Sequence, residues 1–342
     1  MLSLFRRPEA GAAAGFVLIF LFFSFFGWDK NFLTPLGAST WLNFASKVGI
    51  IAIPIGFLMI AGELDISVGA VIPAGGIVLA MAVGLYDLNI WLGVLISLAV
   101  AGFIGFINGL IVTRTRVPSL IVTLATLFVV AGLNAYISKQ LAGTTQHSLQ
   151  DVGPVSEFIL GDYHSWIIGE GDNAFTIFRS LQSSFFIWIV FAAVCFFILH
   201  VSPWGNWIFA MGGDQDSARN AGIPTNKLKI ALFMLSAMAA AMVGMTEAVL
   251  ANTASTTTQF GMIFNTIICV VVGGVLLTGG FGTVTGTVFG TLTFGIVFQG
   301  INFTTFDKDL NLLFIGVLLL IAVLMNDSFR NMATRASTSK KK

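Results

Sequence analysis

The chain has 342 residues, of which 56% are hydrophobic and 10% are Asp, Glu, Lys or Arg. A soluble domain of this size needs more surface charge, so a mean hydropathy of +0.92 excludes a soluble globular protein. The net charge of +1 does not indicate the basic surface that binds nucleic acid. The composition indicates an all-α polytopic membrane protein.

The apolar runs predict about ten transmembrane helices, with eight or nine as alternatives. A helix needs roughly 20 residues to cross about 30 Å of hydrocarbon. The first run follows Arg6 and Arg7 but lacks a small-residue cleavage site, so it is interpreted as an uncleaved span. Pro54 and Pro73 are expected to loosen two of the helices. The predicted spans cover residues 11–27, 42–60, 66–84, 91–112, 120–138, 184–201, 228–250, 263–278, 284–301 and 310–326.

The distribution of Lys and Arg predicts that both termini are cytoplasmic. An even number of spans places the two N-terminal arginines and the lysine tail on the same side as Arg114 and Arg116, as the positive-inside rule requires. Lys47 is then assigned to an outside segment. This topology gives a cytoplasmic N-terminus at 1–10, a transmembrane domain at 11–326 and a cytoplasmic tail at 327–342.

The longest connection, residues 139–183, is therefore expected on the outside. A loop of this length in a compact protein is usually functional or disordered, so it either docks an external partner or forms a cap without one. His147 and His164 lack metal-ligand spacing, and no metal site is predicted. Cys195 and Cys269 each lie in an apolar run and are interpreted as inert core residues.

A polar segment at 202–227 interrupts the apolar runs between the sixth and seventh spans. Asp214 or Asp216 can cap the start of a helix, Gly222 suits its end, and Pro224 prevents its continuation. The pattern predicts a helix of about two turns on the cytoplasmic side. Another protein could push or pull on such a helix.

The turn between the second and third spans carries two carboxylates. Glu63 and Asp65 lie at the expected cytoplasmic end and not at the bilayer centre, where a charge costs roughly 2.5–3.5 kcal/mol or more. Asp65 or Ser67 is placed to cap the next helix. A structural role is therefore favoured, and a substrate or proton site is the alternative.

Glycines recur at helical spacing late in the chain, at Gly282, Gly286 and Gly290. Small residues let transmembrane helices approach closely, so this stripe predicts packing within the protein, with a face between two copies as the alternative. Gly105 and Gly109 repeat the spacing five spans earlier, which suggests two five-helix halves.

Several polar residues are candidates for a translocation pathway. Glu247 is the acidic residue that lies clearly inside a predicted span, and Asn252 and Thr256 belong to the hydroxyl-rich segment that follows it. Uncharged hydrogen-bonding groups suit a polyol better than an ion, and an exposed polar loop is the alternative. Asn108 is a further candidate, which could instead bond a neighbouring helix.

Two features that the sequence lacks narrow the range of possible functions. No predicted span has a central Asp, Lys or Arg, which disfavours a proton-coupled carrier. No Gly-x-x-x-x-Gly-Lys-Ser/Thr phosphate loop is present, so any ATP must be hydrolysed by another chain. Because no nucleophile–base pair is visible either, the chain is not predicted to be an enzyme or to bind a cofactor.

Four blocks of sequence form a recognisable series. Residues 62–69 read Gly-Glu-Leu-Asp-Ile-Ser-Val-Gly, and residues 108–124 hold Asn-Gly followed by Val-Pro-x-x-Ile-x-Thr-Leu. Residues 212–229 form the polar segment and its basic flank, and residues 272–286 form a glycine-rich block. From about 45 to 326 the chain resembles, in the same order, permease subunits of bacterial ABC importers for ribose, xylose, arabinose, galactose and similar sugars.

The resemblance implies that 202–227 is a cytoplasmic coupling loop that docks into a separate ATPase subunit. It also implies two permease copies around one pathway, an external sugar-binding protein, an inner-membrane location, and ATP and Mg held by the ATPase. Two departures are a longer outer loop and Trp204-Gly-Asn206 in place of Gly-Arg before the coupling loop. The coupling residues that the resemblance implies are Asp214, Asp216, Ser217, Arg219, Asn220 and Gly222.

The function expected from this resemblance is import of a monosaccharide, such as a pentose or hexose, driven by the separate ATPase. The same architecture could instead carry a branched-chain amino acid, a nucleoside or a signalling furanone. A self-sufficient secondary carrier is the alternative from a different class.

Overall fold

The computed structural model describes residues 8–149, 152–168, 175–317 and 320. Among these residues, six helices are long and apolar enough to cross a membrane, and three shorter apolar helices accompany them. They are the helices of a polytopic membrane protein. The long ones are α2 (Pro35–Ile60), α4 (Ile90–Arg114), α5 (Ser119–Ala142), α7 (Ser183–His200), α10 (Thr225–Ala251) and α12 (Val284–Gly300), and the shorter ones are α1 (Pro8–Phe26), α3 (Val68–Gly84) and α11 (Phe260–Val272).

These helices correspond to nine of the predicted spans. Predicted span 310–326 lies partly outside the described residues, within which 311–317 is helical. The tail and most of the N-terminal segment also lie outside them. α11 ends at Val272, earlier than expected, because Gly274 takes a left-handed backbone conformation with φ of 84° that a helix cannot continue.

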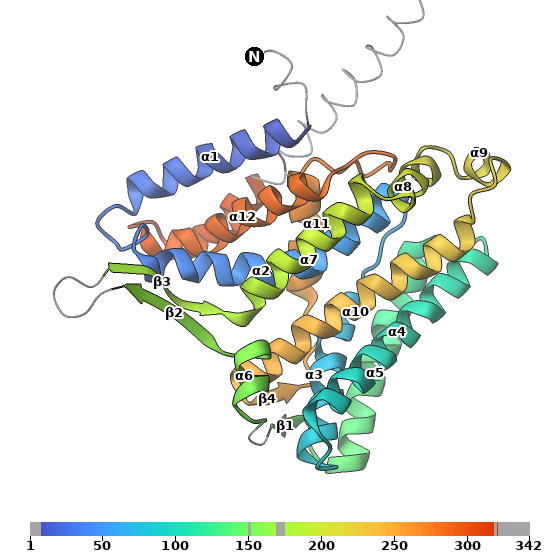
Figure 1. The fold of residues 1–342 in the computed structure, drawn as a ribbon, viewed down its shortest axis with the longest axis horizontal. Coiled ribbons are helices and arrows are strands. Elements are labelled where there is room, and N and C mark those ends of the chain that lie inside the picture. Colours follow the sequence, from blue (N-terminus) through green and yellow to red (C-terminus); the bar gives the residue numbers. More distant parts are fainter. Residues whose placement is uncertain (1–7, 150–151, 169–174, 318–319, 321–342) are drawn as a thin grey trace, which may run out of the picture.

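The two halves of the chain interleave. α10 packs on α4 and α3, while α12 packs on α2 and α1. Figure 1 shows α1, α2, α7, α11 and α12 on one side of α10, and α3, α4 and α5 on the other. The earlier and the later helices therefore pack among one another and do not form two separate bundles within the described residues. α2 is central, since 89% of its most apolar stretch is buried, against 22% for α5.

The outer loop corrects the all-α prediction, because it holds regular structure of another kind. β1 (Gln146–Ser148) pairs with β4 (Thr253–Ser255), and β2 (Tyr163–Ile168) pairs with β3 (Phe175–Gln182), both antiparallel. These two sheets satisfy backbone groups that a long irregular connection would leave unpaired. A short helix, α6 (Pro154–Leu160), lies between them along the chain. Figure 1 places the sheets at the end of the molecule opposite α9 (Gln215–Asn220).

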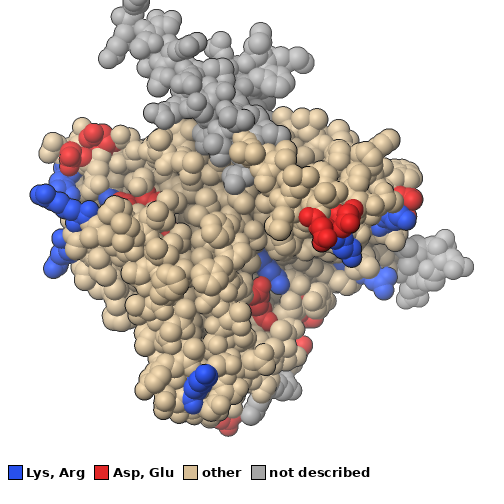
Figure 2. Space-filling model, turned by 180° about the vertical axis from the view of Figure 1, so that it is seen from behind, with Lys and Arg blue, Asp and Glu red and all other residues tan. Residues whose placement is uncertain are grey.

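Charged side chains lie mainly toward the edges of the molecule. In Figure 2 most Lys, Arg, Asp and Glu side chains gather at the margins, and uncharged surface dominates the middle. Phe103, Phe128 and Phe197 are among the exposed apolar side chains. Such a surface suits contact with hydrocarbon, which does not solvate charge.

Candidate functional site

The predicted helix in the polar segment is present as α9, which runs from Gln215 to Asn220 between the two predicted capping residues. Asp214 is its N-cap, and Asp214 Oδ1 accepts a 2.6 Å hydrogen bond from the Ser217 N–H. At its other end Gly222, with φ of 86°, donates its N–H to the Arg219 carbonyl, and Ile223 donates to Ala218. This pattern is a Schellman motif, so the capping predictions for Asp214 and Gly222 are confirmed.

Most polar side chains of α9 are exposed, whereas Gln215 is partly buried. Ala218 is buried and anchors the helix, whereas all six residues of the predicted coupling set are exposed. Arg219 reaches Asn226 at 3.5 Å, near the limit of a hydrogen bond. α9 is therefore held by its caps, by the buried Ala218 and by a hydrogen bond from Lys229 to Gln215, and it presents an open polar surface. That exposed set is Asp214, Asp216, Ser217, Arg219, Asn220 and Gly222.

A further helix, α8 (Pro203–Gly213), precedes α9 and was not expected from the sequence. Its end packs against α2 so closely that a Cβ on Gly212 would overlap the Ile60 carbonyl oxygen and lie 2.6 Å from the Gly280 nitrogen. That Ile60 carbonyl also accepts a 2.7 Å hydrogen bond from the Gly280 N–H. The end of α2, the end of α8 and the turn at 279–280 therefore meet through their backbones.

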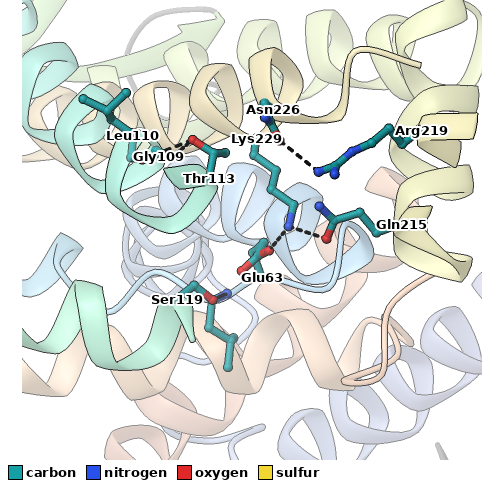
Figure 3. Close-up of polar contacts among 10 residues, drawn as sticks. Glu63, Gly109, Leu110, Thr113, Ser119, Gln215, Arg219, Asn226 and Lys229 are labelled. Carbon is teal, nitrogen blue, oxygen red and sulfur yellow. Dashed lines mark hydrogen bonds and ion pairs between the residues drawn. The ribbon is translucent and has the colours of Figure 1, made fainter. Parts of the chain in front are cut away.

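A buried ion pair joins α10 to the segment that follows α2. The Lys229 amine donates to Glu63, and both side chains are largely buried. The same amine donates to Gln215 Oε1 of α9 over 2.8 Å. Figure 3 shows Lys229 extending between Glu63 and Gln215. A buried charge needs a partner in this way, because desolvation penalises an unpaired ion heavily.

Asp65 and Ser67 bind each other and do not provide the predicted side-chain cap of α3. Ser67 occupies the N-cap position without a capping hydrogen bond. Its hydroxyl donates to Asp65 Oδ1 over 2.6 Å and accepts from Asn108 Nδ2 over 3.0 Å. Asp65 Oδ1 also accepts the Ser67 N–H at 2.9 Å. Neither side chain caps α3, because both are hydrogen-bonded within this buried network.

Segment 61–67, which we call the junction segment, is also fixed by α4 and α5. Asn108 of α4 is fully buried, and its Oδ1 accepts a 2.6 Å hydrogen bond from the Thr126 hydroxyl of α5. The Leu64 N–H donates to the Ser119 hydroxyl at 3.1 Å. The Asn108 amide thus donates to Ser67 and accepts from Thr126. These bonds to neighbouring elements correspond to the structural role that was the alternative to a place on the translocation pathway.

The glycines late in the sequence pack against other residues of the same chain. A Cβ on Gly286 would overlap the Gly273 carbonyl oxygen, and one on Gly290 would overlap that of Cys269. Gly282 lies beside Val275 and Ile60, where a Cβ would come within 2.8 Å and 2.9 Å of their side chains. The stripe thus packs α12 against α11 and the turns around it, as small residues allow.

A second polar cluster lies toward the other end of α10. Lys47 Nζ is 3.6 Å from Glu247 Oε1, and Gln259 Nε2 donates to Glu247 Oε2 over 3.0 Å. Lys47 is the thirteenth residue of the 26-residue α2, because that helix starts at Pro35. Lys47 therefore belongs to α2 and not to a connection between helices, and it pairs with Glu247 near the C-terminal end of α10.

The two remaining pathway candidates hold the outer sheet. Asn252 ends α10 with φ of 51°, and its carbonyl accepts a 3.0 Å hydrogen bond from the Leu149 N–H. The Thr256 N–H donates to the Thr145 carbonyl at 3.1 Å. The hydroxyl-rich segment is therefore tied to the outer loop by its backbone, a pairing that the sequence did not indicate. The side chain of Asn252 is exposed, and that of Thr256 is partly buried.

The His, Cys, Asp and Glu side chains are scattered through the part of the chain that the structure describes. No group of three or more His, Cys, Asp or Glu side chains there could hold a metal ion. Cys195 and Cys269 are both buried and free. Both lie inside apolar helices, so the core interpretation fits their positions.

The family of the chain follows from comparison with known proteins. The family model described as branched-chain amino acid transport system / permease component matches residues 37–323. The chain belongs to this family. The resemblance to permease subunits of ABC importers is thereby confirmed, and the permease is a multi-pass protein of the inner membrane. No enzymatic family is indicated.

The permease resembles several curated proteins along most of its length. It is 30% identical over 277 residues to the inner membrane ABC transporter permease protein YjfF of Escherichia coli K12, covering 81% of this chain and 79% of that protein. It is 30% identical to the L-arabinose ABC transporter permease protein AraH of Azospirillum brasilense, with coverages of 93% and 88%. The ribose import permease protein RbsC of Escherichia coli K12 is 29% identical, with coverages of 87% and 88%. No solved structure matches the chain.

The four sequence blocks that carried the resemblance come together in the fold of the permease. Glu63 of the first block pairs with Lys229 of the third, and Ser67 bonds Asn108 of the second. Gly280 of the fourth block meets the end of α2. Residues far apart in sequence thus surround the junction segment, beside the exposed α9.

Removing the Asp214 cap is expected to loosen α9 without disturbing the membrane helices. The pKa of the Asp214 carboxyl is lowered from its ordinary value of 3.8, chiefly by the backbone N–H of Ser217. Its stabilising effect is therefore complete above that value and is lost as the pH falls through the lowered pKa, so α9 should not change between about pH 6 and 8. Asp214→Ala should accelerate hydrogen exchange across 215–223, measured by mass spectrometry.

The matched control for this experiment is Asp216→Ala, which removes the same group two residues away. Asp216 is exposed in the first turn of α9, and Asp214 is the residue that caps it. Equal acceleration in both variants would mean that general charge, and not the cap, holds this helix.

Proposed function

We propose that this permease is the passive transmembrane subunit of an ATP-driven importer of a monosaccharide. Relatives carry the printed names of ribose, L-arabinose and fructose permeases, and they match this chain along most of its length. Without its own phosphate loop the chain needs energy from an ATPase subunit, which would hold ATP and Mg. The chain itself then performs no catalysis and binds no cofactor.

The observation that carries the proposal is the connection between α9 and the junction segment. α9 is exposed and polar, yet through Gln215 it shares the buried Lys229 amine with Glu63. A partner that moves α8 and α9 would therefore also pull on Glu63 and on the end of α2. We assign the exposed face of α9, from Asp214 to Gly222, as the docking surface of the ATPase.

The opposite end of the permease offers a place for the substrate to enter. Lys47, Glu247 and Gln259 form a partly buried hydrogen-bonding cluster contributed by α2, α10 and the start of α11. Lys47 and Glu247 pair with each other, so the cluster is electrically balanced and suits an uncharged polyol. We place this cluster on the pathway, below the sheets of the outer loop where an external binding protein would dock, with a second permease copy completing the pathway.

Reconstitution tests the class of transport. Proteoliposomes that contain the permease, its ATPase and its binding protein should accumulate one of ribose, L-arabinose or fructose when ATP is supplied. Proteoliposomes that contain the permease alone should accumulate none of them under an ion gradient. Gradient-driven uptake by the single chain would reject the proposal in favour of a secondary carrier.

The family description names branched-chain amino acids, so leucine belongs in the same substrate panel. If the Lys47–Glu247 pair opened, its two charges would complement the carboxylate and amine of an amino acid. ATP-dependent uptake of leucine without uptake of any sugar would keep the importer architecture but replace the substrate class.

A further inference from the structure

An apolar groove runs along the outside of the helix group α3, α4 and α5. It encloses about 630 Å³, which is within the range of about 300–1,000 Å³ seen for ligand sites. Large apolar side chains line it from all three helices. Along α5 the lining extends from Ile121 to Ser138, which corresponds to about 26 Å at the rise of an α-helix. The lining includes Ile77, Met81, Phe103, Ile107, Ile121 and Val129.

The few polar side chains in this groove are already engaged or lie at its far end. The Thr126 hydroxyl donates to Asn108 over 2.6 Å, and Asn134 Nδ2 donates to the Ala70 carbonyl over 3.0 Å. The wall that remains is suited to hydrocarbon and not to a sugar. The groove is therefore separate in chemistry from the Lys47–Glu247 cluster.

Two arginines stand at the α9 end of the groove. Arg114 is the last residue of α4, three residues after the lining residue Ile111, and Arg116 directly precedes the lining residue Val117. Both are exposed, and within the described residues neither lies within 4.0 Å of a carboxylate. Figure 2 shows basic side chains at the margin that corresponds to the α9 end of Figure 1. An unpaired guanidinium pair at one end of a hydrocarbon groove matches an anionic phospholipid.

We propose that this groove binds an anionic phospholipid, with an acyl chain between α4 and α5 and the headgroup phosphate at Arg114 and Arg116. A second copy of the chain fits this face less well. The close-packing glycines of α4 already face α10, since a Cβ on Gly105 or Gly109 would meet Met234 or Ile230 within 2.6 Å.

Native mass spectrometry of the full chain in detergent tests the proposal with phosphatidylglycerol and phosphatidylcholine as probes. The unmodified permease should bind phosphatidylglycerol about tenfold or more tightly than phosphatidylcholine, because each nearby arginine attracts the anionic headgroup. Arg114→Gln combined with Arg116→Gln should remove this preference. Lys30→Gln combined with Lys227→Gln, which removes two exposed charges away from the groove lining, should retain it. Equal binding of the two lipids by the unmodified protein would overturn the proposal without any variant.

A second pair of variants tests the groove itself. Ala125 lines the groove and is exposed, so Ala125→Trp should fill it and weaken binding of both lipids. Leu124→Trp, at an exposed neighbouring position outside the lining, should leave binding unchanged. Unaltered lipid binding in Ala125→Trp contradicts the groove as the site. Loss of a permease dimer in Ala125→Trp, with lipid binding unaltered, would assign this face to a second copy.

Discussion

Replacing Gly212 with alanine is expected to lower ATP-dependent uptake by about tenfold or more, because a side chain there overpacks a backbone contact. The added Cβ would overlap the Ile60 carbonyl oxygen, and the Gly280 nitrogen lies 2.6 Å away. The end of α8 would have to move from the end of α2, which breaks the backbone contact between α8 and α2 beside the junction segment. Uptake by the reconstituted complex is the measurement.

The neighbouring glycine provides the control. A Cβ on Gly213 would find no atom within 4 Å, so Gly213→Ala should transport at nearly the unmodified rate. If the two variants transport equally well, the backbone contact between α8 and α2 does not matter for coupling. Gel filtration of both variants should accompany the assay, so that loss of folded protein is not mistaken for loss of coupling.

Lys229→Met is expected to destabilise the permease by about 3–5 kcal/mol, because it leaves Glu63 buried without its partner. Glu63→Gln should have a comparable effect, since it leaves the Lys229 ammonium with a neutral acceptor. The double variant should recover much of the loss, because removing both charges also removes their desolvation penalty. Thermal unfolding of the purified protein in detergent measures all three variants.

Lys227→Met is the matched control for this series. Lys227 lies two residues away on α10, but its side chain is exposed, and it should change stability little. A double variant that is as unstable as the sum of its parts would show that Glu63 and Lys229 contribute independently. The pair would then not be the connection between α10 and the junction segment.

The membrane helices were predictable because length and hydropathy alone specify them. Nine predicted spans have counterparts, and the caps of α9 follow from the types of Asp214 and Gly222. The predicted ends of the helices were less accurate wherever polar or small residues extend a helix beyond its apolar run. α2 starts at Pro35, because the proline suits a first turn and the Thr34 hydroxyl accepts from the Gly37 N–H.

The contacts between distant segments could not be read from the sequence. Glu63 and Lys229 are 166 positions apart, and their pairing depends on how α10 lies against α2. A buried acid does signal that some cation must lie nearby, but it does not say which one. The sheet between β1 and β4 was missed for the same reason, since three-residue strands carry too little pattern to be recognised.

The central claim of this account is that the ATPase acts on the permease through α9. Ser217→Cys places an exposed thiol on this helix, and the two native cysteines are buried, so a maleimide photo-crosslinker can be attached selectively. In the assembled importer, irradiation should link this position to the ATPase subunit, whereas the same label at Lys139→Cys near the outer loop should not. Crosslinking to the ATPase from Lys139→Cys and none from Ser217→Cys would contradict the account.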